Sequence, residues 1–119
     1  MLRRLLLPLA LVGIALAATT AGNAATRSAG LTGEVGPGYT IEVKLNGMDM
    51  KTIKAGTYKI KVEDKASVHD FHLTGPGVNK KTSVGATGTT TWTVTLKKGT
   101  YKYVCDPHAS SMNGSFKVA

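Results

Sequence analysis

The sequence predicts an all-β fold, a β-sandwich of about eight short strands. Glycine occurs 14 times in the 119 residues, and threonine and valine recur along the chain. Valine and threonine fit the pleated surface of a strand, whereas glycine permits tight turns. Beyond the N-terminal segment, no long stretch repeats apolar residues with the period of a helix. Short alternating segments separated by Gly, Pro or Asn are typical of a sandwich with antiparallel sheets.

Residues 1–24 are predicted to be a secretory signal peptide rather than part of this fold. Arg3 and Arg4 give a positive start, residues 5–18 form an apolar run, and small residues follow. The run is short for a membrane span, and no cysteine follows it that could carry a lipid. Cleavage after Ala24 or after Ala17 would satisfy the small-residue rule. We expect residues 25–119 to be one domain, exported by the general secretory route to a periplasm or the extracellular space, with no membrane anchor.

Alternation and turn residues place the eight strands in the mature chain. We expect them at residues 31–35, 40–45, 50–53, 57–63, 68–73, 89–96, 100–104 and 114–118. The clearest alternation puts Trp92, Val94 and Leu96 on one buried face. Residues 77–84 could hold a single helical turn, and no other helix is needed.

Three metal-binding residue types, Cys105, His108 and Met112, fall between the last two predicted strands. A loop that continues into a strand at each end can hold ligands rigidly. Thiolate and thioether sulfur select copper over magnesium, calcium or manganese, and imidazole also suits copper. Structural zinc usually takes four Cys or His ligands, for which methionine is a poor substitute. The set therefore favours copper, provided that a second histidine arrives from elsewhere.

His69 can supply the missing imidazole. In a strand at 68–73, alternation places His69 on the same inward face as Phe71 and Leu73, and His72 on the other face with Asp70. A β-bulge could reverse this, so His72 remains a lesser candidate and is otherwise expected to be an exposed histidine. The predicted metal ligands are His69, Cys105, His108 and Met112. Two imidazoles and a thiolate with a weak axial thioether form the blue-copper arrangement.

With these residues the chain resembles the cupredoxins, the small type 1 (blue) copper proteins such as plastocyanin, amicyanin and pseudoazurin. The resemblance rests on the Cys-x2-His-x3-Met loop and on the stretches HDFHLTGPG, from His69, and YVCDPHA, from Tyr103. It covers nearly the whole mature chain. It implies a Greek-key β-sandwich with one type 1 copper ion that carries single electrons between redox proteins. It also implies that His108 emerges at an apolar surface patch where electrons enter and leave.

Asp70 departs from the pattern of that family, which usually has asparagine at this place. The asparagine helps to tie the two ligand-bearing loops together by hydrogen bonds, and a carboxylate accepts such bonds but does not donate them. The resemblance further implies that Asp70, Pro107 and Phe116 surround the ligands.

Each candidate ligand also has an ordinary explanation. Cys105 alone could be a small buried hydrophobe, His108 a loop histidine and Met112 core filler. Their joint occurrence at this spacing, with an inward histidine upstream, favours the copper site. Two other functions stay open: a periplasmic copper carrier or store without an electron-transfer role, and a β-sandwich interaction module without metal. Met48 and Met50 could form a second Cu(I) site, although packing is their simpler role.

The charge of the mature chain bears on its partners. Without Arg3 and Arg4, 13 Lys and Arg stand against 7 Asp and Glu, a net charge of +6. The lysines are scattered rather than clustered with aromatic residues, which argues against a nucleic-acid partner. A basic surface aids solubility or steers an acidic redox partner. We expect a monomer that is not an enzyme, because protein would fill all four ligand positions of the metal.

Overall fold

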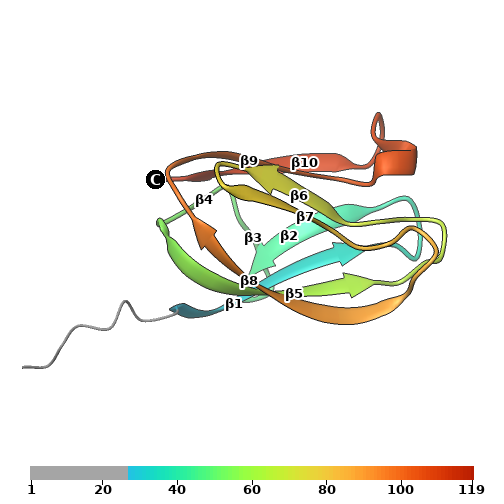
Figure 1. Cartoon of the computed structure of the whole chain (residues 1–119), viewed down its shortest axis with the longest axis horizontal. Helices are drawn as coiled ribbons and strands as arrows, with labels where there is room; N and C mark the ends of the chain where they lie inside the picture. The colour runs from blue at the N-terminus through green and yellow to red at the C-terminus, as the bar shows by residue number, and fades with distance from the viewer. Residues whose placement is uncertain (1–26) are drawn as a thin grey trace, which may run out of the picture.

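Two five-stranded β-sheets pack face to face in a computed structural model that describes residues 27–119 (Figure 1). The predicted signal peptide lies outside the described residues. The first sheet has the order β3 (Met48–Asp49), β2 (Ile41–Leu45), β1 (Arg27–Val35), β5 (Gly56–Asp64) and β8 (Gly88–Leu96). The second has the order β4 (Thr52–Ile53), β10 (Asn113–Val118), β9 (Gly99–Val104), β6 (His72–Gly75) and β7 (Val78–Lys81). The predicted all-β sandwich is confirmed. None of the helices in this part of the chain has the length and hydropathy of a membrane span.

The expectation of purely antiparallel sheets is wrong for two strand pairs. Strand β1 pairs in parallel with β5, and β4 pairs in parallel with β10. The chain leaves β1 through β2 and β3, crosses to the second sheet as β4, and re-enters the first sheet as β5. Because this crossover returns the chain to the end at which β1 began, β5 must run in the same direction as β1.

Three local expectations also differ from the structure. Residues 78–81 form strand β7 instead of a helical turn, because Pro76 and Gly77 close a two-residue hairpin with β6. Proline followed by a glycine at φ +71° is typical of a type II turn. The strand expected at 68–73 begins only at His72, so His69 lies in an irregular segment. A short 3-10 helix, η1 (Asp106–His108), follows β9, with Pro107 in its first turn.

The core fills the space between the sheets. Its fully buried side chains include Leu31, Val35, Ile60, Val62, Phe71, Leu73, Leu96 and Tyr101. Val94 and Leu96 are buried as predicted, and Trp92 is half-buried against the same core. Phe71 packs directly on Gly33 in β1, where an added Cβ would stand 2.5 Å from the phenyl Cζ. The absence of a side chain at Gly33 therefore lets Phe71 bring the segment that carries His69 close to the first sheet.

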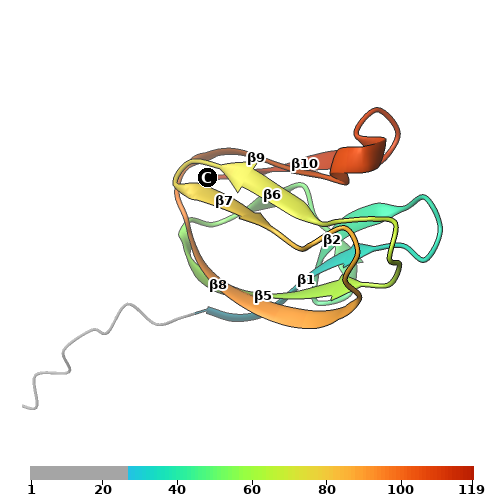
Figure 2. The ribbon, with the colours of Figure 1, turned by 45° about the vertical axis from the view of Figure 1, so that its right-hand side comes forward.

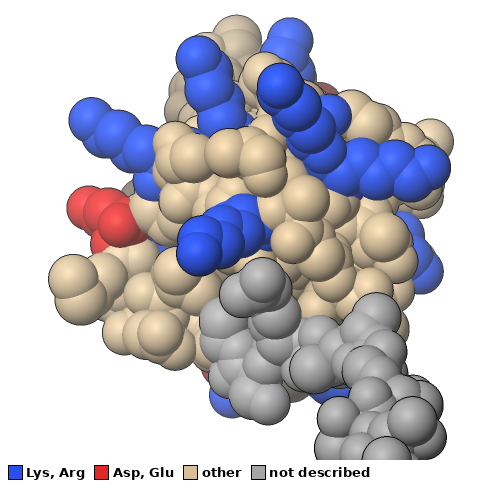
Figure 3. Space-filling view, turned by 90° about the vertical axis from the view of Figure 1, so that its left-hand side faces the viewer, with Lys and Arg blue, Asp and Glu red and all other residues tan. Residues whose placement is uncertain are grey.

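The ends of the sandwich differ in character. At the end where β1, β5 and β9 finish, which we call the loop end, lie the 36–40 loop, the segment 65–71 and η1 (Figure 2). On the face at the opposite end, several lysine side chains project from the surface (Figure 3). Lys54, Lys97 and Lys98 belong to that end, since they lie in the turns that precede β5 and β9. These three lysines thus lie away from the loop end, whereas Lys65 and Lys81 lie at it.

Candidate metal centre

Three of the predicted ligands, His69, Cys105 and His108, converge at the loop end. The two Nδ1 atoms of the imidazoles are 3.2 Å apart, and the Cys105 Sγ lies 3.6 Å from Nδ1 of His69 and 3.5 Å from Nδ1 of His108. A point equidistant from these three atoms is about 2 Å from each, close to the metal–nitrogen and metal–sulfur distances of about 2.0–2.3 Å in proteins. Both Nδ1 atoms face the sulfur, so the donor set fits one metal ion in a trigonal plane.

Backbone hydrogen bonds hold the loop from Cys105 to Met112. The Cys105 N–H donates to the Met112 carbonyl (3.0 Å), which joins the two ends of the loop. The Met112 N–H donates to the His108 carbonyl (2.8 Å), and the His108 N–H to the Cys105 carbonyl (3.0 Å). Met112 is 1% exposed, in the same loop as the Cys105 and His108 donors and directly before β10. These bonds fix the backbone of all three loop residues relative to one another.

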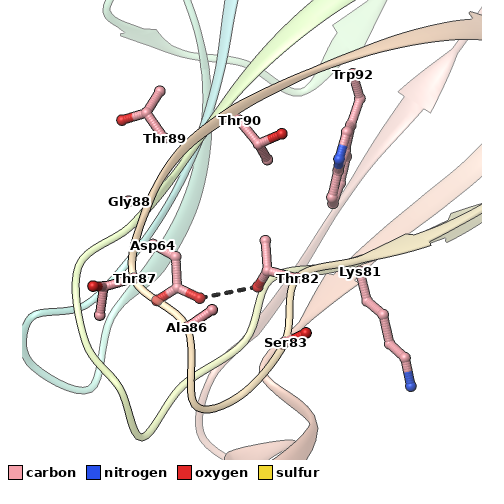
Figure 4. A pocket seen from close by; sticks show the side chains of 10 residues that line it. All are labelled: Asp64, Lys81, Thr82, Ser83, Ala86, Thr87, Gly88, Thr89, Thr90 and Trp92. Carbon is pink, nitrogen blue, oxygen red and sulfur yellow. Dashed lines mark hydrogen bonds between the residues drawn. The ribbon is translucent and has the colours of Figure 1, made fainter.

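The segment that carries His69 is held by a network that the sequence did not reveal. The buried Asp64 accepts a hydrogen bond from the Thr82 hydroxyl (3.0 Å; Figure 4), and Thr82 Oγ1 in turn accepts one from the Phe71 N–H (2.9 Å). Asp64 also accepts a bond from the Ala66 N–H (3.3 Å). Together these bonds replace the strand ladder that residues 65–71 lack, and they position His69, which is 1% exposed. Threonine and aspartate are common residues, so only their spatial proximity identifies this role.

Asp70 ties the two ligand-bearing segments together. It was expected on the outward face, but it is buried, and its Oδ1 accepts a hydrogen bond from the Asp106 N–H (2.6 Å). Burial, and then the neighbouring Asp106, raise the pKa of Asp70. Hydrogen bonds with Asp70 and His72 lower the pKa of Asp106. Asp70 thus links the two segments as a hydrogen-bond acceptor.

Replacing Asp70 tests this link between the segments. Asp70→Ala should lower the free energy of unfolding of the metal-free protein by about 1–3 kcal/mol, because the Asp106 N–H loses its partner. Asp70→Asn keeps an acceptor in place and should stay within about 0.5 kcal/mol of the native protein. Urea unfolding of the three proteins measures both values. Equal losses in the two variants would show that the charge of Asp70, rather than its acceptor, matters.

His72 lies outside the triangle of donors. It is half-buried rather than exposed, and its Nδ1 is 3.0 Å from both carboxylate oxygens of Asp106, while its Nε2 is 2.7 Å from Asn79 Oδ1. Both ring nitrogens thus face acceptors, which suits the protonated imidazole. Burial works against the charged form, but the hydrogen bonds to Asp106 and Asn79 outweigh it and raise the pKa of His72. His72 therefore fastens β6 to the loop that follows Cys105.

The shifted pKa of His72 predicts a pH-dependent contribution to stability. Because the pKa is raised in the folded protein, the contribution is fully present below the ordinary value of 6.5 and is lost as the pH rises through the folded pKa. His72→Gln should therefore destabilise the metal-free protein more at about pH 5 than at about pH 8.5. Chemical unfolding at both pH values checks this. The charged groups near His72 are Asp106, Asp70 and Lys81, the last opposite His72 in the β6–β7 pair.

The thiol of Cys105 is buried, and the chain offers no second cysteine with which it could form a disulfide. It is 0% exposed and is the only cysteine of the chain. Burial raises the pKa of this thiol. A metal ion must therefore displace a proton when it binds the sulfur.

The methionines at 48 and 50 have separate places. Met48 is 71% exposed on β3, and Met50 packs against the hydrophobic core. Within residues 27–119, the clusters of three or more His, Cys, Asp or Glu are the His69, Cys105 and His108 set and the Asp70, His72 and Asp106 set. Packing accounts for Met50 in the structure.

Comparison with known proteins decides the family. A family model described as copper binding proteins, plastocyanin/azurin family, matches residues 17–119. The chain belongs to the plastocyanin/azurin family. This membership confirms the resemblance to cupredoxins and copper as the cofactor, and it agrees with the donor set of His69, Cys105 and His108. No match was found among curated proteins.

Solved structures of rusticyanin share the cupredoxin fold with this chain. One, described as a copper protein, is 23% identical, with a TM-score of 0.55 over 75% of this chain and 76% of that chain. A rusticyanin variant is 25% identical over the same shares, also with a TM-score of 0.55. Rusticyanin from Thiobacillus ferrooxidans is 22% identical, with a TM-score of 0.51 over 75% of each chain. The likeness agrees with the β-sandwich fold of this chain.

Proposed function

We propose that this cupredoxin carries single electrons between redox proteins, with one type 1 copper ion that His69, Cys105 and His108 would hold and with Met112 as a weaker fourth ligand. The observation that carries the proposal is the triangle of two nitrogens and one sulfur, with sides of 3.2–3.6 Å, in a buried site. Imidazole and thiolate in a plane with an axial thioether are the donors of a blue-copper centre.

Copper, when bound, would supply a one-electron Cu(II)/Cu(I) couple. The contribution of the protein is to keep the donors in place during the redox change. Hydrogen bonds within the 105–112 loop, the Asp70 link to Asp106 and the Thr82 bond to Phe71 limit the rearrangement of the donors. Outer hydrogen bonds of this kind orient ligands and tune a metal centre. A rigid donor set lowers the reorganisation that accompanies each electron transfer.

We further propose that partners dock at the loop end through apolar contacts. His108 is half-buried there, next to the exposed Pro107, while Tyr39 and Val68 are 69% and 55% exposed. The mature chain is basic, and its lysines would accelerate encounter with an acidic partner over long range. Higher salt should therefore slow association. The partner would be a redox protein, met after export to a periplasm or the extracellular space, and the carrier itself would be a monomer without enzymatic activity.

Reversible electron exchange would distinguish the electron carrier from its main rival. A copper carrier or store would use the same donors, since burial of Cys105 and His69 also favours retention of Cu(I). The test is voltammetry of the copper-loaded protein, together with nuclear magnetic resonance line broadening in mixtures of the oxidised and reduced forms. An electron carrier gives a reversible one-electron wave and rapid self-exchange. An irreversible wave together with copper release on reduction would instead support the role in copper handling.

A further inference from the structure

An exposed tyrosine lies against both histidines of the metal centre. Tyr39, in the 36–40 loop between β1 and β2, meets His69 edge-on, with ring centroids 5.4 Å apart and planes at 70°. It meets His108 in the same way, at 5.0 Å and 90°. The two imidazoles are themselves 4.9 Å apart at 77°, so the three rings form one cluster. Tyr39 is 69% exposed, whereas His69 is 1% exposed. The tyrosine is therefore the outermost ring of the cluster.

The loop that carries Tyr39 is fixed against the His69 segment. The Gly36 N–H donates to the Thr40 carbonyl (2.9 Å), which closes the loop, and the Lys65 N–H donates to the Val35 carbonyl (2.9 Å). Gly36 has φ +73°, and an added Cβ would stand 3.2 Å from Cδ2 of the His69 ring. The backbone thus approaches the imidazole closely, at a position that favours glycine. The place of Tyr39 over the histidines follows from this attachment.

We propose that Tyr39 is a positioning residue of the copper centre, which holds the two imidazole rings in orientation and keeps water away from them. The proposal rests on the proposed function, because it assigns His69 and His108 as ligands. Edge-to-face aromatic contacts stabilise a structure beyond the burial of their surface area. Rotation of either imidazole would break its contact with Tyr39. The phenol ring therefore restrains two ligands from a third segment of the chain.

Exclusion of water by Tyr39 would act on the redox couple. A centre shielded from water favours the oxidation state with the smaller net charge. With one thiolate bound, the Cu(I) centre is neutral and the Cu(II) centre is positive. Shielding therefore favours the reduced state, and the Tyr39 ring should raise the reduction potential. Removing the ring admits water beside His108 and should lower the potential. The phenol hydroxyl makes no hydrogen bond within residues 27–119, so this effect belongs to the ring rather than to the hydroxyl.

The test compares Tyr39→Ala with Tyr39→Phe, using Met48→Ala as a control. Met48 is an exposed apolar residue, 71% exposed, on β3 away from the loop end. For the copper-loaded proteins we measure the reduction potential and the rate of copper transfer to an excess of chelator. For the metal-free proteins we measure the unfolding midpoint. Tyr39→Ala should lower the reduction potential. It should also release copper about 10-fold faster, because removing a residue that supports a metal ligand usually weakens metal binding by about this factor.

Tyr39→Phe keeps the ring and should match the native protein, as should Met48→Ala. The unfolding midpoints of all the metal-free variants should stay close to the native value, because the Tyr39 side chain is mostly exposed. A native potential and a native release rate in Tyr39→Ala would overturn the proposal. A lower unfolding midpoint of metal-free Tyr39→Ala, with the reduction potential and the rate of copper release unchanged, would also overturn the proposal. Tyr39 would then have a structural role alone. If native protein bound copper without reversible cycling, the electron-carrier function would fail, while the chelator comparison would still decide the role of Tyr39.

Discussion

Cys105→Ser should abolish the intense visible absorption of the Cu(II)-loaded protein and remove the narrow copper hyperfine splitting from its electron paramagnetic resonance spectrum. Both signatures require a thiolate bonded to copper. A serine hydroxyl stays protonated in this buried position and cannot replace the soft sulfur donor. The side chain at position 105 is fully buried. Because the side chains of serine and cysteine differ little in volume, the fold of the metal-free protein should persist. The effect expected is complete loss of the band rather than a shift.

A serine in the same loop provides the matched control for this experiment. Ser111 is exposed, and its hydroxyl makes only a long bond (3.4 Å) to the His108 carbonyl. Ser111→Ala should retain both spectroscopic signatures. A native protein that stayed colourless with an ordinary tetragonal Cu(II) signal would reject the blue-copper assignment. That result would favour a role in copper handling.

Tyr101→Ala should produce the largest loss of stability, about 3–5 kcal/mol, as for large aromatic residues removed from a core. Tyr101 is 0% exposed and stacks on Phe116 at 5.5 Å. Its hydroxyl donates to the Pro76 carbonyl (2.8 Å) and accepts from the Lys97 N–H (2.9 Å). Its ring also packs on Gly75, which leaves room for it in β6. One side chain thus joins β9 to two turns at the end opposite the metal centre.

Tyr101→Phe separates the hydrogen bonds from the packing. It should cost about 1–3 kcal/mol, because the Pro76 carbonyl and the Lys97 N–H lose their common partner. Lys102→Ala, the exposed neighbour on β9, should stay within about 0.5 kcal/mol of the native protein. Urea unfolding of the metal-free proteins measures all three. A loss for Tyr101→Ala no larger than that for Tyr101→Phe would show that the ring contributes nothing by packing.

The candidate donors could be predicted from the sequence because the type of a residue decides whether it can bind a metal. Few residues bind copper well, and Cys105, His108 and Met112 lie close together in the chain. Their loop lies between strands β9 and β10, whose alternation is strong, so its position at one end of the sandwich followed from local pattern. The inward direction of His69 was also predicted, although the reason given for it, a strand through 68–73, is wrong.

The surroundings of the donors depend on contacts between residues far apart in the sequence. The Asp64–Thr82–Phe71 network, the Asp70 bond to Asp106 and the Tyr39 ring over the histidines each join segments that share no local pattern. Aspartate, threonine and tyrosine have ordinary roles on any strand or loop, so their types do not predict these contacts.

The sequence by itself determined the β-sandwich and the candidate copper ligands, because the period of side chains along a strand and the chemistry of a ligand depend on single residues and their near neighbours. Only the tertiary structure decided the parallel strand pairs, the irregular segment that carries His69 and the burial of Asp70. These features arise when hydrogen bonds and packing between distant segments outweigh local strand propensity, and such contacts exist only once the two sheets have come together.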